Sequence, residues 1–225
     1  MIRNFCDGMN FPHLHWISYG NSRNDFEIGD DGRKITLIRK SGSNIFVSAY
    51  SKESFPLKTV SYFEVQYTMP TKGRTFTLKD QIKIGVCMNV ENELSNAFSD
   101  HSNGWAFYPY DSALRHQSSG SGIKYGKEIK NGGTIGVIVD TLNGEISFCI
   151  DGENFGVAFK EEAFINNKLY AAIAVLEIGT CFELATLADK LWERRKGIIY
   201  ARMICRLPIF RRLPDGIFRE ITHYL

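Results

Sequence analysis

The 225-residue sequence has no apolar run that approaches the roughly 20 residues needed to span a bilayer. Its beginning also lacks the apolar stretch, about 7–15 residues long, that a signal peptide carries. We therefore expect a cytoplasmic protein, with a nuclear location also compatible, and no contact with a membrane. The five cysteines are an odd number, lie far apart and show no CxxC spacing, which is typical of a reduced protein with buried thiols.

Motifs of catalysis and cofactor binding are missing as well. The sequence contains no GxSxG elbow, no HExxH pair and no phosphate-binding P-loop. His13 and His15 are spaced so that both could ligate a metal, but no further ligands follow at a suitable spacing, and we predict that both face solvent. The sequence therefore predicts a protein that is not an enzyme and that uses no metal, no cofactor and no small-molecule substrate.

Charge is distributed unevenly along the chain. Residues 187–225 hold nine lysines and arginines against four aspartates and glutamates, a balance of +5, whereas the rest of the chain has a balance of −3. A basic segment of this kind could contact nucleic acid. A solvated helix face explains the same pattern more simply, so we do not expect nucleic acid as a partner.

The body of the chain, from about residue 34 to 186, consists of short runs rich in Val, Ile, Phe, Tyr and Thr, separated by Gly, Asn, Asp and Ser. Many such runs, with no long helical pattern between them, favour a β-sandwich or a barrel. An apolar fraction of 44% is enough to fill its core. The predicted strands span residues 34–39, 62–69, 82–89, 104–108, 134–140, 145–151, 155–159, 169–176 and 180–184.

Two turns of the predicted sheet can be placed from the sequence. The Asn143-Gly144 pair lies between two alternating runs and predicts a type I′ turn, because both residues tolerate positive φ angles. The Asp151-Gly152 pair predicts the next turn. The three runs around these two pairs are therefore expected to form a three-stranded meander.

Alternation within the runs predicts which side chains are buried. Because successive strand residues point to opposite faces, Ile146, Phe148 and Ile150 share one face of the middle strand of the meander, and we predict that this face is the core. By the same rule, Trp105 and Phe107 are predicted to point inward.

Three long connections, residues 40–61, 89–103 and 117–133, interrupt the strands. Loops on a rigid sandwich are where binding residues usually lie, so these connections are candidates for contact with a partner. Tyr108 and Tyr110 are expected near the mouth of such loops. The third connection is polar and rich in glycine and is interpreted more simply as a flexible linker.

Five segments of this body resemble the SPRY domain in sequence, order and spacing. The resemblance implies an all-β fold, a bent antiparallel β-sandwich of the concanavalin-like kind, which binds proteins through loops at one end without catalysis or a cofactor. The implied domain spans residues 15–186, after an N-terminal segment of residues 1–14. The segments are YFEVQ at 62–66, IKIGVC at 82–87, NGWAFYPYDSALRHQ at 103–117, IGVIVDTLNGEISFCIDGENFGVAF at 135–159, and LYAAIAV with GTCFEL within 169–184.

Within this family, the chain resembles the SPRY domain–SOCS box proteins and the related F-box SPRY proteins. The resemblance implies a protein target, a short peptide or loop, as the partner. Glu177 in the last loop would disfavour an acidic peptide, so we expect a target of different chemistry. The positions that the resemblance implies for target binding are Ile45, Val47, Ala49, Leu94, Ala97, Val175, Leu176 and Glu177. Tyr108 and Tyr110 are added as candidates because they are expected near the mouth of the loops.

Residues 187–225 have a helical apolar period and are expected to form a short α-helical appendage. This tail resembles a divergent SOCS box, which implies docking to Elongin B/C and a cullin. The stretch LPDGIFREITHYL, at residues 213–225, also resembles the start of an F-box. The implied ligase-docking residues are Leu191, Arg195, Ile198, Ile199, Leu213, Pro214, Ile217 and Leu225.

Two functions are compatible with these resemblances. The first is a substrate-recruiting adaptor of a cullin-type E3 ubiquitin ligase, in which the SPRY loops bind the target and the C-terminal helices bind ligase subunits. The alternative is a SPRY interaction or scaffold protein with no link to a ubiquitin ligase, in which the tail merely packs on the sandwich.

Overall fold

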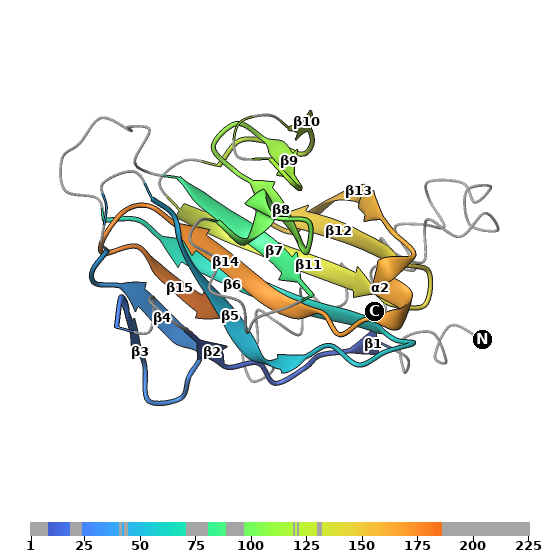
Figure 1. The fold of residues 1–225 in the computed structure, drawn as a ribbon, viewed down its shortest axis with the longest axis horizontal. Coiled ribbons are helices and arrows are strands. Elements are labelled where there is room, and N and C mark those ends of the chain that lie inside the picture. The colour runs from blue at the N-terminus through green and yellow to red at the C-terminus, as the bar shows by residue number, and fades with distance from the viewer. Residues whose placement is uncertain are drawn as a thin grey trace, which may run out of the picture.

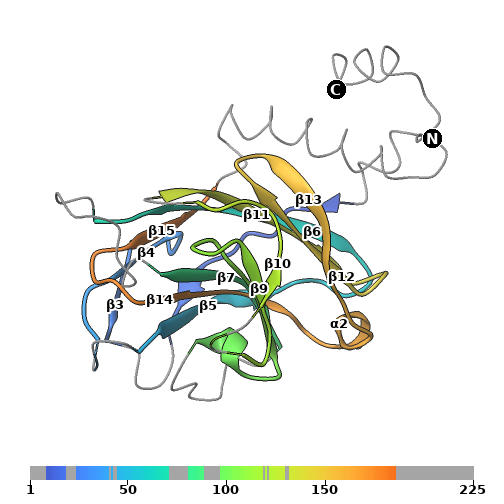
Figure 2. The same ribbon diagram turned by 90° about the horizontal axis from the view of Figure 1, so that it is seen from above.

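The computed structural model shows two β-sheets packed face to face, so the predicted β-sandwich is confirmed (Figure 1 and Figure 2). Two short helices, η2 (Phe98–Asp100) and α2 (Ala163–Asn166), lie between strands. No helix in the described part of the chain has the length and apolar character to cross a membrane. The structure describes residues 9–18, 24–40, 42, 45–70, 81–88, 97–118, 120, 122–129 and 132–185.

One sheet, called sheet A, has eight strands, and its neighbours are antiparallel except that β1 runs parallel to β6. A long ladder joins β6 to β11, from Thr68 opposite Gly132 to Val60 opposite Asp140. In spatial order the strands are β13 (Glu153–Lys160), β12 (Glu145–Ile150), β11 (Gly132–Asp140), β6 (Val60–Thr68), β15 (Cys181–Leu184), β4 (Lys34–Leu37) and β3 (Phe26–Ile28), with β1 (Met9–Asn10) beside β6.

The other sheet, called sheet B, has seven antiparallel strands. Its edges, β10 and β2, are only two residues long each. In spatial order the strands are β10 (Ile123–Lys124), β9 (Ala113–Arg115), β8 (Gly104–Tyr108), β7 (Ile82–Cys87), β14 (Tyr170–Val175), β5 (Val47–Ser54) and β2 (Trp16–Ile17).

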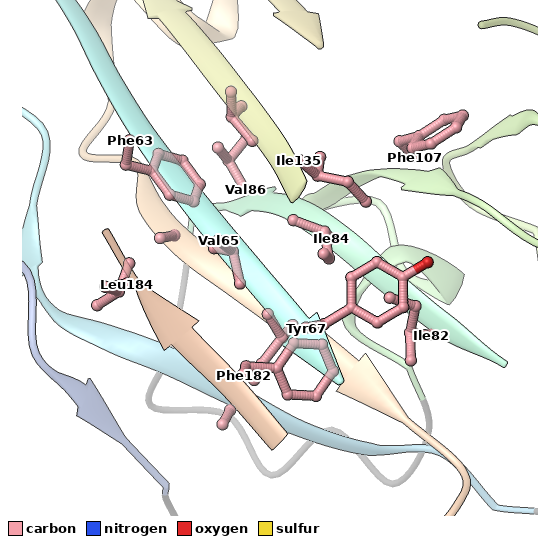
Figure 3. Close-up of a cluster of buried hydrophobic side chains, with 14 of the residues drawn as sticks. Phe63, Val65, Tyr67, Ile82, Ile84, Val86, Phe107, Ile135, Phe182 and Leu184 are labelled. Atoms are coloured by element: carbon pink, nitrogen blue, oxygen red, sulfur yellow. The ribbon is translucent and has the colours of Figure 1, made fainter. Parts of the chain in front are cut away.

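The core lies between the two sheets and is built from alternate residues of the strands. Figure 3 shows Val65, Tyr67 and Phe182 of sheet A in one cluster with Ile82 and Ile84 of sheet B. All five side chains are almost completely buried. Removing one such side chain from water stabilises the fold by about 1.5–3 kcal/mol, so this layer is the main source of stability.

The core residues predicted from alternation are confirmed. Ile146, Phe148 and Ile150 of β12 are fully buried and belong to this cluster. Trp105 and Phe107 of β8 also point inward and are buried there. The period of two in these strands therefore separates the core face from the outer face, as the sequence indicates.

Each of the nine predicted strands overlaps an observed strand, but the prediction that residues 40–61 form a loop is wrong in part. Val47–Ser54 within this segment form β5, which pairs with β14 and β2. Ser48 and Tyr50 are buried on the outer face of the strand, while its core face is buried too. Because both faces of β5 are buried, its residues do not alternate between apolar and polar, and the sequence pattern does not identify it as a strand.

The turn between β11 and β12 does not have the predicted type I′ geometry. Asp140 pairs with Glu145, which leaves a four-residue turn, and in this turn Gly144 has a positive φ of 67° while Asn143 does not. The Asp140 carboxylate accepts hydrogen bonds from the backbone N–H groups of Leu142 and Asn143, both at 2.9 Å. These side-chain bonds favour the longer turn over the two-residue one.

The turn between β12 and β13 has the type I′ geometry that the sequence predicted for the turn between β11 and β12. Ile150 pairs with Glu153, so two residues connect the strands. Asp151 and Gly152 have φ angles of 49° and 81°. Two consecutive positive φ angles are the signature of a type I′ turn, and the predicted meander of three strands is confirmed.

β13 is the outermost strand of sheet A in the described chain, and it is kinked near its middle. Gly156 has a φ of 103°, and its N–H donates to Oδ1 of Asn154 at 2.9 Å. Its carbonyl accepts a 2.6 Å hydrogen bond from the Tyr125 hydroxyl, which also accepts a 3.1 Å bond from the N–H of Phe148. The register between β12 and β13 shifts here, so the edge strand carries a β-bulge.

Candidate protein-binding surface

At one end of the sandwich the chain passes between the sheets in several places, and two of these crossings lie next to each other (Figure 1). It passes from sheet A to sheet B between β4 and β5, and it returns between β14 and β15. The crossings are bonded to each other, because the N–H of Gly179 donates to the carbonyl of Leu37 (2.7 Å) and the N–H of Leu37 donates to that of Thr180 (3.1 Å). The loop end is defined as residues 38–40, 42, 45, 46 and 176–180.

Further contacts fix the loop end to the strands below it. Nζ of Lys40 donates a hydrogen bond to the carbonyl of Leu176. Val47 and Val175 are paired where β5 begins and β14 ends, so both crossings meet sheet B at the same place. The described residues of the loop end therefore stand on a rigid scaffold, which is the usual arrangement of binding loops.

Three isoleucine side chains are exposed at the loop end. Ile38 is 49% exposed, Ile45 is 42% exposed and Ile178 is 46% exposed. Single exposed aliphatic side chains are ordinary, but a group of them on neighbouring connections is typical of an interaction site. These three residues are called the isoleucine corner.

Charged side chains of both signs lie near the isoleucine corner in the described part of the chain. Nε of Arg39 lies 3.4 Å from Oδ1 of Asp25. Lys40 is bound to the Leu176 carbonyl, and Glu177, which is half-buried, follows directly in the chain. Among the residues that the structure describes, the charged side chains nearest the corner are thus two cations and two anions.

The outer face of sheet B, next to the loop end, is covered by the chain itself. It receives the ring of Phe98, which is fully buried, and the N–H of Phe98 donates to Oγ of Ser48 at 3.1 Å. A side chain at Gly104 would not fit, because its Cβ would lie 2.2 Å from the Phe98 carbonyl oxygen. The Phe98 ring packs in one cluster with three small residues of sheet B: Ala106, Ala172 and Ala174.

A buried ion pair holds η2 on this face. Nζ of Lys83 lies 2.5 Å from Oδ1 of Asp100, and the two side chains are 1% and 11% exposed. The Lys83 ammonium also lies 4.6 Å from the centroid of the Phe46 ring, within the range of a cation–π contact. Burial lowers the pKa of Lys83, and the Asp100 carboxylate opposes this shift. The pair therefore fixes η2 on β7 although two charges must be desolvated.

A second ion pair continues along the same face. Nη2 of Arg115 lies 2.5 Å from Oδ2 of Asp111, and the guanidinium carbon lies 4.9 Å from the centroid of the Tyr108 ring. The rings of Tyr108 and Tyr110 are 6.0 Å apart. Burial raises the pKa of the Tyr108 hydroxyl above its ordinary value. Tyr108 is therefore part of a packed layer and not an exposed platform.

A minority of the predicted target-binding residues present a side chain at the surface. Ile45 is exposed, and Tyr110 and Glu177 are half-buried, so these three can contact a partner directly. Leu94 lies outside the described residues. The remaining members of the predicted set are buried: Val47, Ala49, Ala97, Tyr108, Val175 and Leu176.

The prediction that Val47 and Ala49 lie in a loop is wrong. Both belong to β5, with exposed fractions of 5% and 0%. Val47 pairs with Val175, and Ala49 pairs with Ile173, so β14 holds this segment in the sheet. Their side chains belong to the core and support the loop end from below.

Three residues of this surface were not predicted to belong to it. Ile38 was included in the predicted strand 34–39, but β4 ends at Leu37 and leaves Ile38 exposed on the crossing; Ile178 lies on the short connection between β14 and β15. Lys83 interrupts the apolar run IKIGVC, and a lysine in a buried strand indicates a partner of opposite charge.

The two histidines considered as metal ligands face solvent, as predicted. His13 and His15 are both exposed, and Nδ1 of His15 lies 2.9 Å from Oε1 of Glu53. The backbone N–H of His15 donates to the other oxygen of this carboxylate at 2.8 Å. Among the residues that the structure describes, no three His, Cys, Asp or Glu side chains are grouped as metal ligands would be.

The predicted helical appendage and its ligase-docking residues lie outside the described residues, so their role stays a prediction. These residues are Leu191, Arg195, Ile198, Ile199, Leu213, Pro214, Ile217 and Leu225.

The family of the chain is shown by a family model. The model of the SPRY domain matches residues 60–186, which is more than half of the chain. The chain therefore belongs to the SPRY family, and the resemblance inferred from the sequence is confirmed. SPRY domains are protein-interaction modules, so binding of another protein is the general activity that this fold indicates. The SOCS-box resemblance of the tail stays a prediction.

A curated protein is similar over most of the chain. The Ran-binding proteins 9/10 homolog of Drosophila melanogaster is 23% identical over 227 aligned residues, which cover 95% of this chain. The match covers 21% of that protein, so this chain spans about a fifth of the length of its relative.

Solved structures support the fold. The SPRY domain of human HERC1 has a TM-score of 0.55 and 15% identity, and the match covers 73% of this chain and 94% of that one. The PSpry domain of TRIM65 has a TM-score of 0.55 and 14% identity, with 82% and 96% coverage. Stonustoxin has a TM-score of 0.53 and 13% identity, with 78% and 27% coverage. At these identities the likeness shows a shared architecture.

Proposed function

We propose that this chain binds a target protein, as a short peptide or loop, through the loop end of its SPRY domain. The observation that carries this proposal is the isoleucine corner, three exposed aliphatic side chains on two crossings that are bonded to each other. A partner that covers these side chains gains about 25 cal/mol for each Å² of apolar surface removed from water. We place the domain at residues 15–186, and we propose that it acts without catalysis or a cofactor.

Replacing Ile45 and Ile178 by aspartate in the full chain is expected to weaken target binding by about tenfold or more, because each carboxylate would have to be desolvated against an apolar partner. Quantitative affinity capture from the native cell, read by mass spectrometry, measures this loss. Leu142→Asp is the matched control, since Leu142 is an aliphatic residue that is 53% exposed on the β11–β12 turn at the opposite end. Capture that survives the double variant, or that the control abolishes equally, would contradict the proposal.

We propose in addition that the chain recruits its target to a cullin-type ubiquitin ligase. The support is the resemblance of residues 187–225 to a SOCS box. Two binding faces on one chain would keep the target close to the ligase subunits at a high effective concentration. The alternative is a SPRY scaffold protein with no ligase link.

Replacing Leu191 and Leu213 by aspartate in the full chain is expected to remove Elongin B/C and the cullin from the captured proteins while the target remains bound. The reason is that both changes place a charge in an apolar docking surface. Western blotting of the capture reads both partners in one experiment. If the unmodified chain captures neither Elongin B/C nor a cullin, the adaptor function is excluded and the scaffold function stands.

We also propose that the protein acts in the cytoplasm, with a nuclear location compatible, and that its basic tail does not bind nucleic acid. Affinity for a nucleic-acid duplex that falls steeply with salt would contradict the latter, because displacement of counterions from phosphates produces such a dependence.

A further inference from the structure

We infer that the outer face of sheet A, the face turned away from the core, is the docking site of the chain's own C-terminal segment, residues 186–225. The inference goes beyond the proposed function and does not depend on target binding at the loop end. It is carried by two observations, the burial of apolar side chains on this face and the place where the C-terminal segment leaves the sheet.

Apolar side chains on the outer face of sheet A are buried. Because side chains alternate along a strand, Tyr62 of β6 and Ile138 of β11 point away from the core, whereas Phe63 and Val137 point into it. Tyr62, Ile138 and Cys149 are nevertheless only 1%, 5% and 1% exposed, and they form one cluster. Side chains on a face open to water would be exposed, so a segment of chain covers this cluster.

A described side chain covers one side of the cluster. The ring of Phe11, which follows β1, meets the ring of Tyr62 edge-on, with 6.2 Å between the centroids. β1 and β11 lie on opposite sides of the same residues of β6, and Cys149 lies on β12, beyond β11. Three strand spacings of about 4.8 Å therefore separate β1 from Cys149, which is further than one phenyl ring extends.

The C-terminal segment leaves sheet A beside this cluster. β15 ends at Leu184, and the N–H of Ala185 donates to the carbonyl of Glu64 at 3.0 Å. Further along the same side of β6, β1 pairs with Val60 and Ser61. β15 cannot continue far before it meets β1, so the chain has to leave the plane of the sheet. The core fills the inner side, and the outer side is the open direction.

The sequence of the C-terminal segment suits this face. A helix of about 12 residues is about 18 Å long, which is enough to cross the strands from β6 to β13 at about 4.8 Å for each step. Leu187, Leu191 and Ile198 follow one another at i, i+4 and i+11, so a helix would gather them on one side. Packing this stripe on the buried cluster removes apolar surface of both from water.

Other segments outside the described residues are less suitable as the cover. The segment between Pro70 and Gln81 follows the opposite end of β6, about 25 Å from Tyr62 at about 3.3 Å for each strand residue. The residues before Met9 adjoin β1 in the chain, and they are the alternative cover.

The stripe includes Leu191 and Ile198, which are also proposed to dock ligase subunits. A stripe packed on sheet A is not available to a ligase subunit, so the two arrangements exclude each other. Recruitment of a ligase would therefore require the C-terminal segment to leave the sheet.

Thiol labelling of the full chain tests the inference, because Cys149 lies on the outer face of sheet A whereas Cys87 belongs to sheet B. Both thiols are buried, with exposed fractions of 1% and 0%. Replacing Leu187 and Leu191 by aspartate is expected to raise the rate at which iodoacetamide modifies Cys149 by about tenfold or more, since a buried thiol reacts only when its cover opens. Cys87 should stay protected. Peptide mass spectrometry reads each cysteine separately.

Lys196→Asp is the matched control. It changes the net charge by as much as the double variant does, and on a helix Lys196 would lie opposite the stripe, so both rates should stay unchanged. Cys149 that stays protected in the double variant would overturn the inference and assign the cover to another part of the chain, such as the residues before Met9. Equal labelling of Cys149 in the control would overturn it too.

Labelling of both Cys149 and Cys87 would mean that the double variant has opened the whole fold, and cross-linking with an unmodified C-terminal segment then decides. Val157 of β13 is 46% exposed and pairs with Ser147, so its side chain lies on the outer face of sheet A. Photo-reactive benzoylphenylalanine at position 157 is expected to cross-link to residues 186–225, whereas the same group in place of Ile123, which is 75% exposed on sheet B, is not.

The possible failures separate this inference from the proposed function. No cross-link from position 157 to residues 186–225, or an equal one from position 123, would overturn the inference. Neither thiol labelling nor cross-linking involves a target or a ligase subunit. Loss of target capture in the Ile45 and Ile178 variant therefore has no bearing on where the C-terminal segment docks.

Discussion

Replacing Lys83 by alanine is expected to lower the free energy of unfolding by about 3–5 kcal/mol, because the change leaves the Asp100 carboxylate buried without its counter-charge. Unfolding in urea, followed by tryptophan fluorescence, measures the loss. A double variant that removes both charges, Lys83→Met with Asp100→Leu, is expected to recover most of the stability, since no unpaired charge then remains in the interior.

An exposed ion pair of similar length provides the control. Nζ of Lys160 lies 2.7 Å from Oε1 of Glu145, but the Lys160 side chain is 70% exposed. Lys160→Ala is expected to change the free energy of unfolding by less than about 1 kcal/mol, because water solvates the remaining carboxylate. Equal losses for Lys83→Ala and Lys160→Ala would show that burial of the first pair has no energetic consequence.

Replacing Phe148 by alanine is expected to lower the free energy of unfolding by about 3–5 kcal/mol, through lost burial and the cavity left behind. Phe148 is fully buried, and the centroid of its ring lies 5.7 Å from that of Phe107 and 6.0 Å from that of Tyr125. The three rings come from β12, β8 and the segment after β10, so the cavity would open between distant parts of the chain. The same urea titration measures the effect.

Ile123→Ala serves as the comparison for Phe148→Ala. Ile123 is 75% exposed, and its truncation is expected to change the free energy of unfolding by no more than about 0.5 kcal/mol. A loss of less than about 1 kcal/mol for Phe148→Ala would mean that the surrounding rings close the space, and the view of a rigid aromatic cluster would have to be abandoned.

The parts of the fold that follow from local pattern could be predicted from the sequence. Ile146, Phe148 and Ile150 show a period of two, and the structure places all three in the core. β5 could not be predicted in this way, because Ser48 on its outer face is covered by Phe98, which is 50 positions away in the sequence. A pattern read over a few neighbouring residues cannot reveal that a segment so far away in the sequence buries the outer face of β5.

The turn after β11 shows a second limit of local reasoning. Asn143-Gly144 has the composition of a type I′ turn, yet the ladder ends at Asp140 and the Asp140 carboxylate binds the next backbone N–H groups. The preference of Asn143 and Gly144 for a two-residue type I′ turn is thus outweighed by the register of the β11–β12 ladder.

The candidate site was predicted in part. Resemblance to the family identified Ile45 and Glu177, which lie at the surface, but it also selected Val47 and Ala49, because a match in sequence does not say which face of a strand a residue occupies. Lys83 and Asp100 are 17 positions apart, and their pairing depends on how η2 lies on β7. Such a contact is defined by the tertiary structure alone.

The kink at Gly156 has a consequence for solubility. A long, straight outer strand invites identical molecules to add on, strand upon strand, until fibres form. The bend in β13 interrupts such a template at one edge of sheet A, and the other described outer strands are short, with three residues in β3 and two each in β10 and β2. The described edges of the sheets therefore disfavour backbone pairing between copies of the chain. The exposed isoleucines of the loop end remain available to a partner with a complementary apolar surface.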